Sequence, residues 1–333
     1  MSAFAIAKPM PRDPPVTSAT LPVRSNVWGK PDIATRIIES VGELYAARRT
    51  NKTQTSMSFV AIIGSGALGG AVAHTLAVRD RIREIRLIDS EERVAQGKAL
   101  DIRQSSPIDR FATLVVGSGS LAAAAGATAI VLADSASGSG EFAGEAGLTL
   151  LRQVAAMESK APIVFAGGRQ RELIGGGVAE LHIAAARLIG SAPVALESAL
   201  RALAALSIDS SGVPIAVNVV GVPPNNAVVA WEEASVAGQP LTSQVAPHVL
   251  AGLNAKLPGL WPPGTHTLGS AAAGVVEAIA DGSRRRFSCF VHVGNRRVAA
   301  MPVELGEEGV SRVLEPVLTR QERTRLENAI ENC

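Results

Sequence analysis

FVAIIGSGALGG, residues 59–70, consists of five apolar residues, a glycine-rich turn and a segment typical of a helix. The uninterrupted apolar run FVAII predicts a buried strand. The glycines that follow, Gly64, Gly66 and Gly69, have the spacing G-x-G-x-x-G. A strand, a turn of this kind and a helix, in this order, predict the first β-α unit of a dinucleotide-binding fold.

Each glycine of this turn has a physical role. Gly64 permits the tight turn, Gly66 leaves room for a pyrophosphate, and Gly69 lets the helix approach the strand. The helix N-terminus offers unpaired N–H groups and a partial positive charge to phosphates. We therefore predict that the cofactor contacts come from Gly64, Gly66, Ala67, Leu68 and Gly69.

Asp89 closes the next apolar segment, EIRLID, and follows Gly69 by 20 residues. This is the position at which a dinucleotide fold places an acid for the ribose. A carboxylate can accept hydrogen bonds from both ribose hydroxyls and repels a 2′-phosphate. The sequence therefore predicts NAD rather than NADP as the cofactor. The alternative is a purely structural unit with the same turn and no bound nucleotide.

Apolar strands and helical segments alternate after residue 58, which predicts an α/β fold with a parallel, doubly wound sheet. After about residue 195 a long helix, further strands and a charged final helix indicate an α+β lobe. We expect a proline-rich arm with a helix and linker at 1–57, a Rossmann domain at 58–195 and a C-terminal α+β domain at 196–333.

The composition excludes several classes of protein. Hydrophobic residues make up 47% and charged residues 19%, values typical of a globular chain rather than a disordered one. The net charge of +2 and the lack of a basic stripe argue against a nucleic-acid partner. We expect no membrane span, because no apolar run of about 18 residues occurs. No spacing of His, Cys, Asp and Glu predicts a metal site.

Two cysteines, Cys289 and Cys333, give no disulfide framework. Cys289 lies within FSCFVHV, an apolar strand, so we expect a buried thiol. Two unpaired cysteines favour a reducing, cytoplasmic location.

The N-terminal arm carries six of the 19 prolines within its first 31 residues. Apolar residues at helical spacing within 32–49 then predict a short amphipathic helix. One interpretation is an arm that packs on its own oligomer. The other is a docking helix for a protein partner, because the segment resembles the encapsulation peptides of bacterial microcompartment cargo; the chain would then be targeted to a protein compartment. The acids Asp32, Glu39 and Glu43 argue against an organelle presequence.

Further segments carry a resemblance to a known family: GKALDIRQSSPI at 97–108, VVGVPPNNAVVAWEEASVAGQPL at 219–241 and PVELGEEGVSRVLEPVLTRQERTRLENAI at 302–330. With the glycine turn and Asp89, they resemble the lactate/malate dehydrogenase family over residues 58–331. The resemblance implies a Rossmann half followed by a substrate half, a homodimer or homotetramer, and NAD-dependent oxidation of a 2-hydroxy acid.

At the positions that the family uses for catalysis, this sequence departs from the pattern. Pro223 stands where the family has its proton-accepting His, and Leu200 where an Arg binds the substrate carboxylate. Ala143 replaces the Arg of the mobile loop, and Gly167 replaces an Asn near the nicotinamide. Glu197 matches the Asp that orients the His. We therefore expect no ordinary malate or lactate dehydrogenation.

Two function classes remain open, and the sequence leaves undecided whether the chain is an enzyme. One is an atypical oxidoreductase that uses Glu197 or His266 as a displaced acid. The resemblance implies that His266 opens the helix that lines the family's active site; the alternative for its segment, GTHTLGS, is helix capping by the neighbouring Thr residues. The other class is a non-catalytic NAD-binding protein with a structural or regulatory role. Asp134, where the fold usually has a Gly, is expected to weaken NAD binding.

Overall fold

The computed structural model describes residues 59–138, 140–208 and 212–332. These residues belong to one compact unit, Ser56–Cys333. The arm predicted at 1–57, with its helix at 32–49, lies outside the described residues, so its proposed roles stay predictions.

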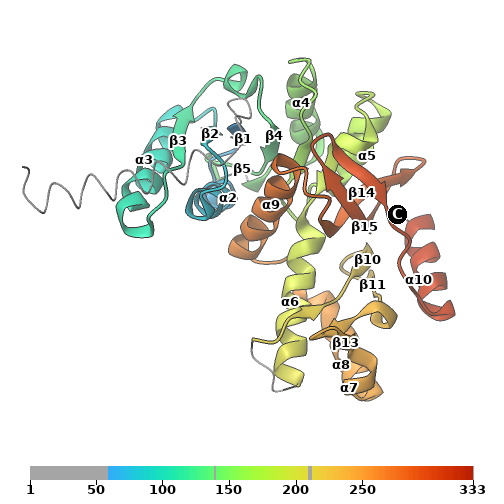
Figure 1. Cartoon of the computed structure of the whole chain (residues 1–333). Coiled ribbons are helices and arrows are strands. Elements are labelled where there is room, and N and C mark those ends of the chain that lie inside the picture. The colour runs from blue at the N-terminus through green and yellow to red at the C-terminus, as the bar shows by residue number, and fades with distance from the viewer. Residues whose placement is uncertain (1–58, 139, 209–211, 333) are drawn as a thin grey trace, which may run out of the picture. The chain divides into compact units, whose positions relative to one another are not determined.

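One large sheet organises the described residues (Figure 1). Its parallel part has the order β3-β2-β1-β4-β7-β8, which is the doubly wound order of a Rossmann fold. The bounds are β1 Phe59–Ile63, β2 Glu84–Ile88, β3 Leu114–Ser118, β4 Ala129–Leu132, β7 Ile163–Phe165 and β8 Leu188–Gly190. The predicted parallel sheet is thereby confirmed.

From β1 the chain adds β2 and β3 on one side of the sheet, and then returns to add β4, β7 and β8 on the other side of β1. Helices α2, Ala67–Arg79, and α3, Glu92–Asp109, connect β1, β2 and β3. Helices α4, Gly144–Ala155, and α5, Arg171–Ala179, connect β4, β7 and β8 in the opposite direction. Because such crossovers are right-handed, the two pairs cover opposite faces of the sheet. Helix α9, Thr265–Ala280, packs beside α2 (Figure 1).

An antiparallel part continues the same sheet beyond β8. Its strands are β14 Arg286–Gly294, β15 Arg297–Gly306, β10 Val219–Val222, β11 Asn226–Val229 and, paired with β15, β16 Gly309–Val313. A single residue pair, Phe290 and Gly190, joins β14 to β8. The expected α+β character of the second half follows from this antiparallel part.

A smaller lobe packs against α6, Ala192–Ser207, and has an apolar core of its own to which α6 contributes. It contains α7 Leu241–Gln244, α8 Pro247–Lys256 and a small sheet of β9 Ile215–Ala216, β12 Ser235–Val236 and β13 Gln239–Pro240. Helix α10, Arg320–Glu331, packs on β10 and β11. The predicted domain boundary at 195 and 196 falls inside α6 and stays a prediction.

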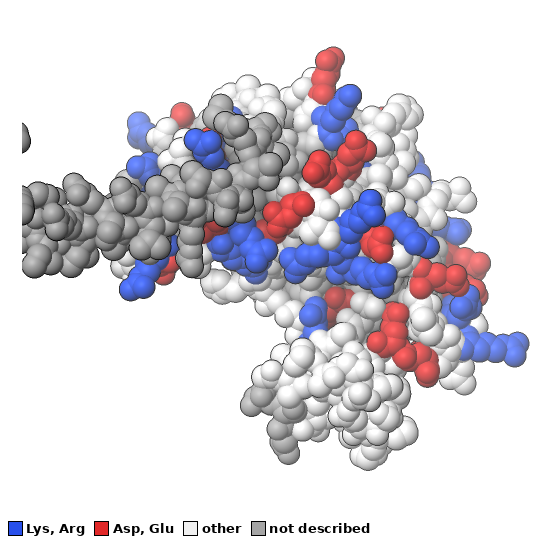
Figure 2. Space-filling model, viewed as in Figure 1, with Lys and Arg blue, Asp and Glu red and all other residues white. Residues whose placement is uncertain are grey.

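Short 3₁₀ helices complete the described elements: η1 Leu121–Ala124, η2 Ala185–Arg187, η3 Trp231–Glu233 and η4 Leu257–Leu260. Acidic and basic side chains lie interspersed around the large sheet on the face shown in Figure 2, whereas the lobe below α6 is nearly free of charge there. Within the described ranges, no helix is long and apolar enough to cross a membrane.

Candidate functional site

The carboxyl ends of β1 and β4 define the crevice in which a doubly wound sheet binds its ligand. The glycine turn follows β1, and the two-stranded hairpin of β5, Asp134–Ser135, and β6, Gly140–Glu141, follows β4. We call residues 134–138 and 140–141 the cleft hairpin. The cleft hairpin therefore lies beside the glycine turn, where the sequence predicts the dinucleotide site.

The glycine turn has the close approaches that its sequence predicts. Gly64 has a φ of +103°, a conformation that side chains rarely adopt. A Cβ on Gly69 would collide with the carbonyl of Gly64, so the missing side chain lets α2 approach β1. The Gly66 N–H donates to the backbone carbonyl of Asp134 at 3.0 Å. The turn is thereby held against the first residue of the cleft hairpin.

Asp134 reaches from the end of β4 to the first turn of α2. Its Oδ2 accepts a hydrogen bond from the Leu68 N–H at 3.0 Å, and its Oδ1 accepts one from the Gly69 N–H at 2.8 Å. A Cβ on Gly66 would collide with this carboxylate. A negatively charged group of the chain itself therefore occupies the space that Gly66 leaves open, at the donors to which a phosphate binds.

Asp89 lies directly after β2 and is only 4% exposed. Its Oδ2 accepts hydrogen bonds from the N–H groups of Ser65, at 2.8 Å, and Ala136, at 2.9 Å, and its Oδ1 accepts one from Glu91 at 3.0 Å. Burial alone raises the pKa of Asp89, but these N–H groups outweigh it and hold the pKa below its usual value. The carboxylate is thus charged and bonded to the cleft hairpin through Ala136.

Glu141, at the other end of the cleft hairpin, bonds to the loop after β7. Its Oε1 accepts from the Gly168 N–H at 3.1 Å, and its Oε2 accepts from the Arg169 N–H at 2.7 Å. A Cβ on Gly167 would collide with this carboxylate. The second end of the hairpin is therefore fixed by a second carboxylate at backbone donors.

Gln170 joins both ends of the cleft hairpin and is fully buried. Its Nε2 donates to the carbonyls of Ala133, at 2.9 Å, and Phe142, at 3.1 Å, while its Oε1 accepts from the Gly167 N–H at 2.8 Å. Sequence reasoning missed Glu141 and Gln170, because nothing in their neighbourhoods shows that they face this crevice. Asp134 was identified, but without its partners.

Comparisons with known proteins agree with this geometry. Residues 59–156 match the NAD-binding domain of the lactate/malate dehydrogenase family. A malate dehydrogenase of Thermomicrobium roseum is 27% identical over 291 residues, which cover 80% of this chain and 93% of that protein. The chain is thus similar to the lactate/malate dehydrogenase family, most directly over its NAD-binding domain. The expectation of NAD as the cofactor is confirmed through the matched domain.

Solved structures of this family have the same fold. A malate dehydrogenase from Salinibacter ruber superposes with a TM-score of 0.74 at 22% identity, covering 82% of this chain and 94% of that one. A lactate dehydrogenase from Cryptosporidium parvum, complexed with lactic acid and NAD, gives a TM-score of 0.73 at 20% identity, covering 84% and 96% of the two chains. The expected fold class is confirmed.

The family's cofactor fits this structure only in part. The glycine turn and Asp89 have the residue types that a dinucleotide requires. The Asp134 carboxylate, however, accepts from the N–H groups at the start of α2. The Asp134 carboxylate therefore lies at the donors to which a dinucleotide phosphate binds in this fold. The individual contacts predicted for the glycine turn and Asp89 stay predictions.

The four residues that the sequence resemblance matched to the family's substrate-binding and catalytic positions carry no charge, and that match stays a prediction. Pro223 is buried directly after β10 and carries no group that accepts a proton. Leu200 is fully buried on α6, in the core of the smaller lobe. Ala143 and Gly167 likewise carry no positive charge and no amide side chain. None of these four side chains can bind a carboxylate or exchange a proton.

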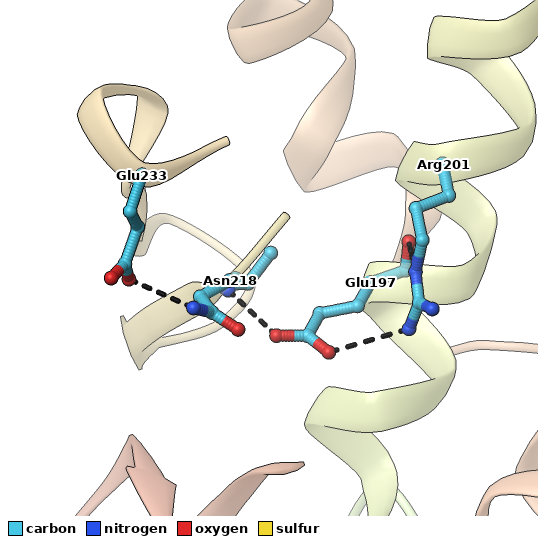
Figure 3. Close-up of polar contacts among 5 residues, drawn as sticks. Glu197, Arg201, Asn218 and Glu233 are labelled. Carbon is cyan, nitrogen blue, oxygen red and sulfur yellow. Dashed lines mark hydrogen bonds and ion pairs between the residues drawn. The ribbon is translucent and has the colours of Figure 1, made fainter. Parts of the chain in front are cut away.

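Glu197 is the carboxylic acid that the sequence resemblance matches to the Asp that orients the family's His. It is buried on α6, and its Oε1 accepts from the Val219 N–H at 2.9 Å, while Oε2 lies 3.5 Å from Nη2 of Arg201 (Figure 3). Burial raises the pKa of Glu197 to about 7, against the opposing effects of the Ser288 hydroxyl, the Val219 N–H and the Arg201 charge. The side chain therefore joins α6 to β10 and titrates near neutral pH.

The other predicted acid has different surroundings. His266 is the second residue of α9 and is exposed. The catalytic roles of Glu197 and His266 stay predictions. Cys289 is fully buried, as expected. In the three described ranges, no group of three or more His, Cys, Asp and Glu is arranged to hold a metal ion.

Proposed function

We propose that this lactate/malate dehydrogenase-like protein is an atypical oxidoreductase that does not act on malate or lactate. One observation carries the proposal: four positions from separate segments, Leu200, Pro223, Ala143 and Gly167, hold no proton acceptor and no positive charge. An unpaired carboxylate in a dry site costs several kcal/mol. A 2-hydroxy acid therefore finds neither a partner for its charge nor an acceptor for its hydroxyl proton.

The substrate class that fits these positions is a carbonyl or alcohol without a carboxylate. Leu200 offers an apolar surface where the family binds an acid. Glu197 supports proton exchange near neutral pH, because burial raises its pKa to about 7. A catalytic group works best when its pKa lies near the operating pH. NAD, when bound, supplies hydride chemistry; the chain's residues supply the apolar surface and the buried acid.

The second candidate is a non-catalytic, NAD-binding protein with a structural or regulatory role. The cleft hairpin favours it, because Asp134 accepts from the phosphate-binding end of α2 and Glu141 accepts from the loop after β7. A homodimer or homotetramer, and a protein partner for the helix at 32–49, are further parts of the proposal. We place the chain in the cytoplasm or in a protein compartment reached through that helix.

The test is NADH oxidation by highly purified full-length protein with oxaloacetate and with pyruvate. We expect turnover far below the range of roughly 1 to 1000 per second usual for enzymes. Pro223→His should restore little, because the missing Arg at Leu200 leaves the acid unoriented and such groups act as a unit. Turnover inside the usual range with either acid would contradict the proposal.

A second assay separates the two candidates. A panel of aldehydes and ketones without carboxylates is screened with NADH for wild-type protein and Glu197→Gln. Turnover by the wild type that is lost in Glu197→Gln, while the variant still unfolds in one cooperative transition, supports the oxidoreductase. NADH binding by calorimetry without any turnover supports the non-catalytic role.

A further inference from the structure

The cleft hairpin crosses the ligand crevice with its two end residues paired, Asp134 opposite Glu141. From this base the two carboxylates diverge: that of Asp134 reaches the start of α2, and that of Glu141 reaches the loop after β7. Between them, Ala136 donates to Asp89, the acid at the end of β2. Three carboxylate contacts therefore span the crevice from β2 to β7.

The glycines of the crevice accommodate these carboxylates. At both Gly66 and Gly167, a Cβ would collide with a carboxylate of the cleft hairpin. The space beside Gly66 is the one through which a pyrophosphate approaches the backbone in a dinucleotide fold. In this conformation the chain fills that space with its own negative charge.

A carboxylate and a pyrophosphate compete for the same donors. The N–H groups of Leu68 and Gly69 point to the Asp134 oxygens at 3.0 and 2.8 Å. Phosphates bind at such helix N-termini because of these donors and the helix dipole. A phosphate brought to the same donors would also meet the charge of Asp134, so the two anions exclude one another.

We propose that the cleft hairpin is an internal competitor of the dinucleotide: NAD binds only after Asp134 leaves the start of α2 and Glu141 leaves the loop after β7. The inference rests on the proposed function in one respect, namely that the chain binds NAD. Asp134 and Glu141 are then residues that set cofactor affinity through the fraction of molecules with an open crevice.

Competition of this kind has a quantitative consequence. The apparent dissociation constant equals the intrinsic constant divided by the fraction of molecules in the competent state. A substitution that weakens the closed state therefore tightens NADH binding, although it adds no contact to the nucleotide. Loss of a charged residue usually weakens or leaves unchanged the affinity for a cofactor, so an increase is a distinctive signature.

Calorimetric titration of the full chain with NADH tests the proposal in Asp134→Asn, Asp134→Gly and Glu141→Gln. Asn has nearly the shape of Asp without its charge, whereas Gly empties the space beside Gly66. We expect the dissociation constant to fall at least tenfold in both Asp134 variants and about threefold in Glu141→Gln. The matched control is Glu145→Gln, an exposed acid at the start of α4, with a change below twofold.

Amide hydrogen exchange of the wild-type chain gives an independent readout. Arg169 donates its N–H to Glu141 in the closed crevice. Saturating NADH should accelerate exchange at Arg169, since Glu141 leaves, while Leu68 and Gly69 stay protected by the phosphates. Melting temperatures of all variants are recorded so that affinities are compared between folded proteins.

Unchanged or weaker NADH binding in both Asp134 variants overturns the inference, as does a lack of binding in every variant. Exchange at Arg169 that slows on adding NADH also contradicts it. Failure of the proposed function appears elsewhere, as turnover of oxaloacetate or pyruvate by the wild type. The ratio of affinities between variants does not depend on that turnover, so the two failures are distinguishable.

Discussion

Glu197 combines two properties at the scale of a single residue: it is a charged type and it is 3% exposed. The Val219 N–H and Arg201 only partly compensate for lost hydration, so burial raises the pKa of Glu197 to about 7. The neighbouring thiol of Cys289 has a raised pKa, first through burial and then through the charge of Glu197. Burial therefore opposes ionisation of both groups, and an ionised Glu197 further opposes ionisation of Cys289.

The raised pKa of Glu197 predicts a pH dependence of the free energy of unfolding. The unfolded group titrates near 4.5 and the folded group near 7, so the native state retains a proton that the unfolded state releases. The contribution of Glu197 to the free energy of unfolding is therefore greatest below pH 4.5 and falls as the pH rises toward 7. We expect a loss of about 2–3 kcal/mol between pH 5 and pH 8.

Urea denaturation at pH 5 and pH 8 measures this effect in wild-type protein and in Glu197→Gln. The Gln variant, which cannot ionise, should lack this part of the pH dependence. The control Glu232→Gln, at an exposed carboxylate, should behave as the wild type. Equal pH dependence in Glu197→Gln and wild type would mean that Glu197 does not titrate in this range.

At the scale of elements, the buried side-chain amide of Gln170 holds the two ends of the cleft hairpin in place. Gln170 pairs with the carbonyls of Ala133 and Phe142 and with the Gly167 N–H. Gln170→Leu has a similar volume but removes the side-chain partners of the Phe142 carbonyl and the Gly167 N–H, while the Ala133 carbonyl keeps only the Phe142 N–H. Each unsatisfied buried group costs about 1–3 kcal/mol, so we expect a loss of about 2–4 kcal/mol in the free energy of unfolding.

Urea denaturation provides the measurement for Gln170→Leu. Gln153→Leu, on the exposed side of α4, is the matched control and should change stability by less than about 0.5 kcal/mol. A loss below about 1 kcal/mol in Gln170→Leu would show that water or local rearrangement satisfies the hairpin ends.

Helix α10, which packs on β10 and β11, begins with a capping box. The Thr319 hydroxyl accepts from the Glu322 N–H at 3.3 Å, and the Glu322 carboxylate accepts from the Thr319 N–H at 2.8 Å. Thr319→Ala should cost about 1 kcal/mol of helix stability. Amide exchange in α10 should therefore accelerate roughly fivefold.

The control for the cap is Thr324→Ala, in the interior of the same helix. Its hydroxyl donates to the Arg320 carbonyl at 3.1 Å, and Ala has the higher helix propensity, so exchange should stay unchanged or slow down. Equal acceleration in both variants would assign the effect to the lost hydroxyl rather than to the cap.

At the scale of the whole molecule, residues 56–333 form a compact unit by themselves. The main apolar core lies in both halves of the sheet, from Phe59 in β1 to Leu305 in β15. Because this core uses residues after the predicted arm, deletion of 1–57 should change the melting temperature by less than about 2 °C. We expect the deletion to change oligomer size or partner capture instead.

Calorimetry and light scattering test the deletion. In the full chain, Ile37→Glu, on the predicted apolar face, should reproduce the change in association, whereas Glu39→Gln on the polar face should not. A truncated chain that fails to fold would show that the arm contributes to the core.

The sequence by itself determined the order of elements in the first half of the described fold. The strand predicted at FVAII has the same bounds as β1, and the helix predicted after the glycine turn is α2. These predictions succeeded because periodicity, the glycine turn and buried apolar runs act over a few neighbouring residues. The absence of a base and of positive charge at Pro223 and Leu200 was equally readable, because it concerns residue type alone.

Only the tertiary structure decided what fills the crevice. Asp134 meets Leu68 and Gly69 across 66 and 65 residues of chain, and Glu141 meets Arg169 across 28. Such contacts depend on β4 lying next to β1 and β7, a pairing that no local pattern of residues determines. Burial decided the pKa of Glu197 in the same way, since desolvation belongs to the surroundings of a group and not to its residue type.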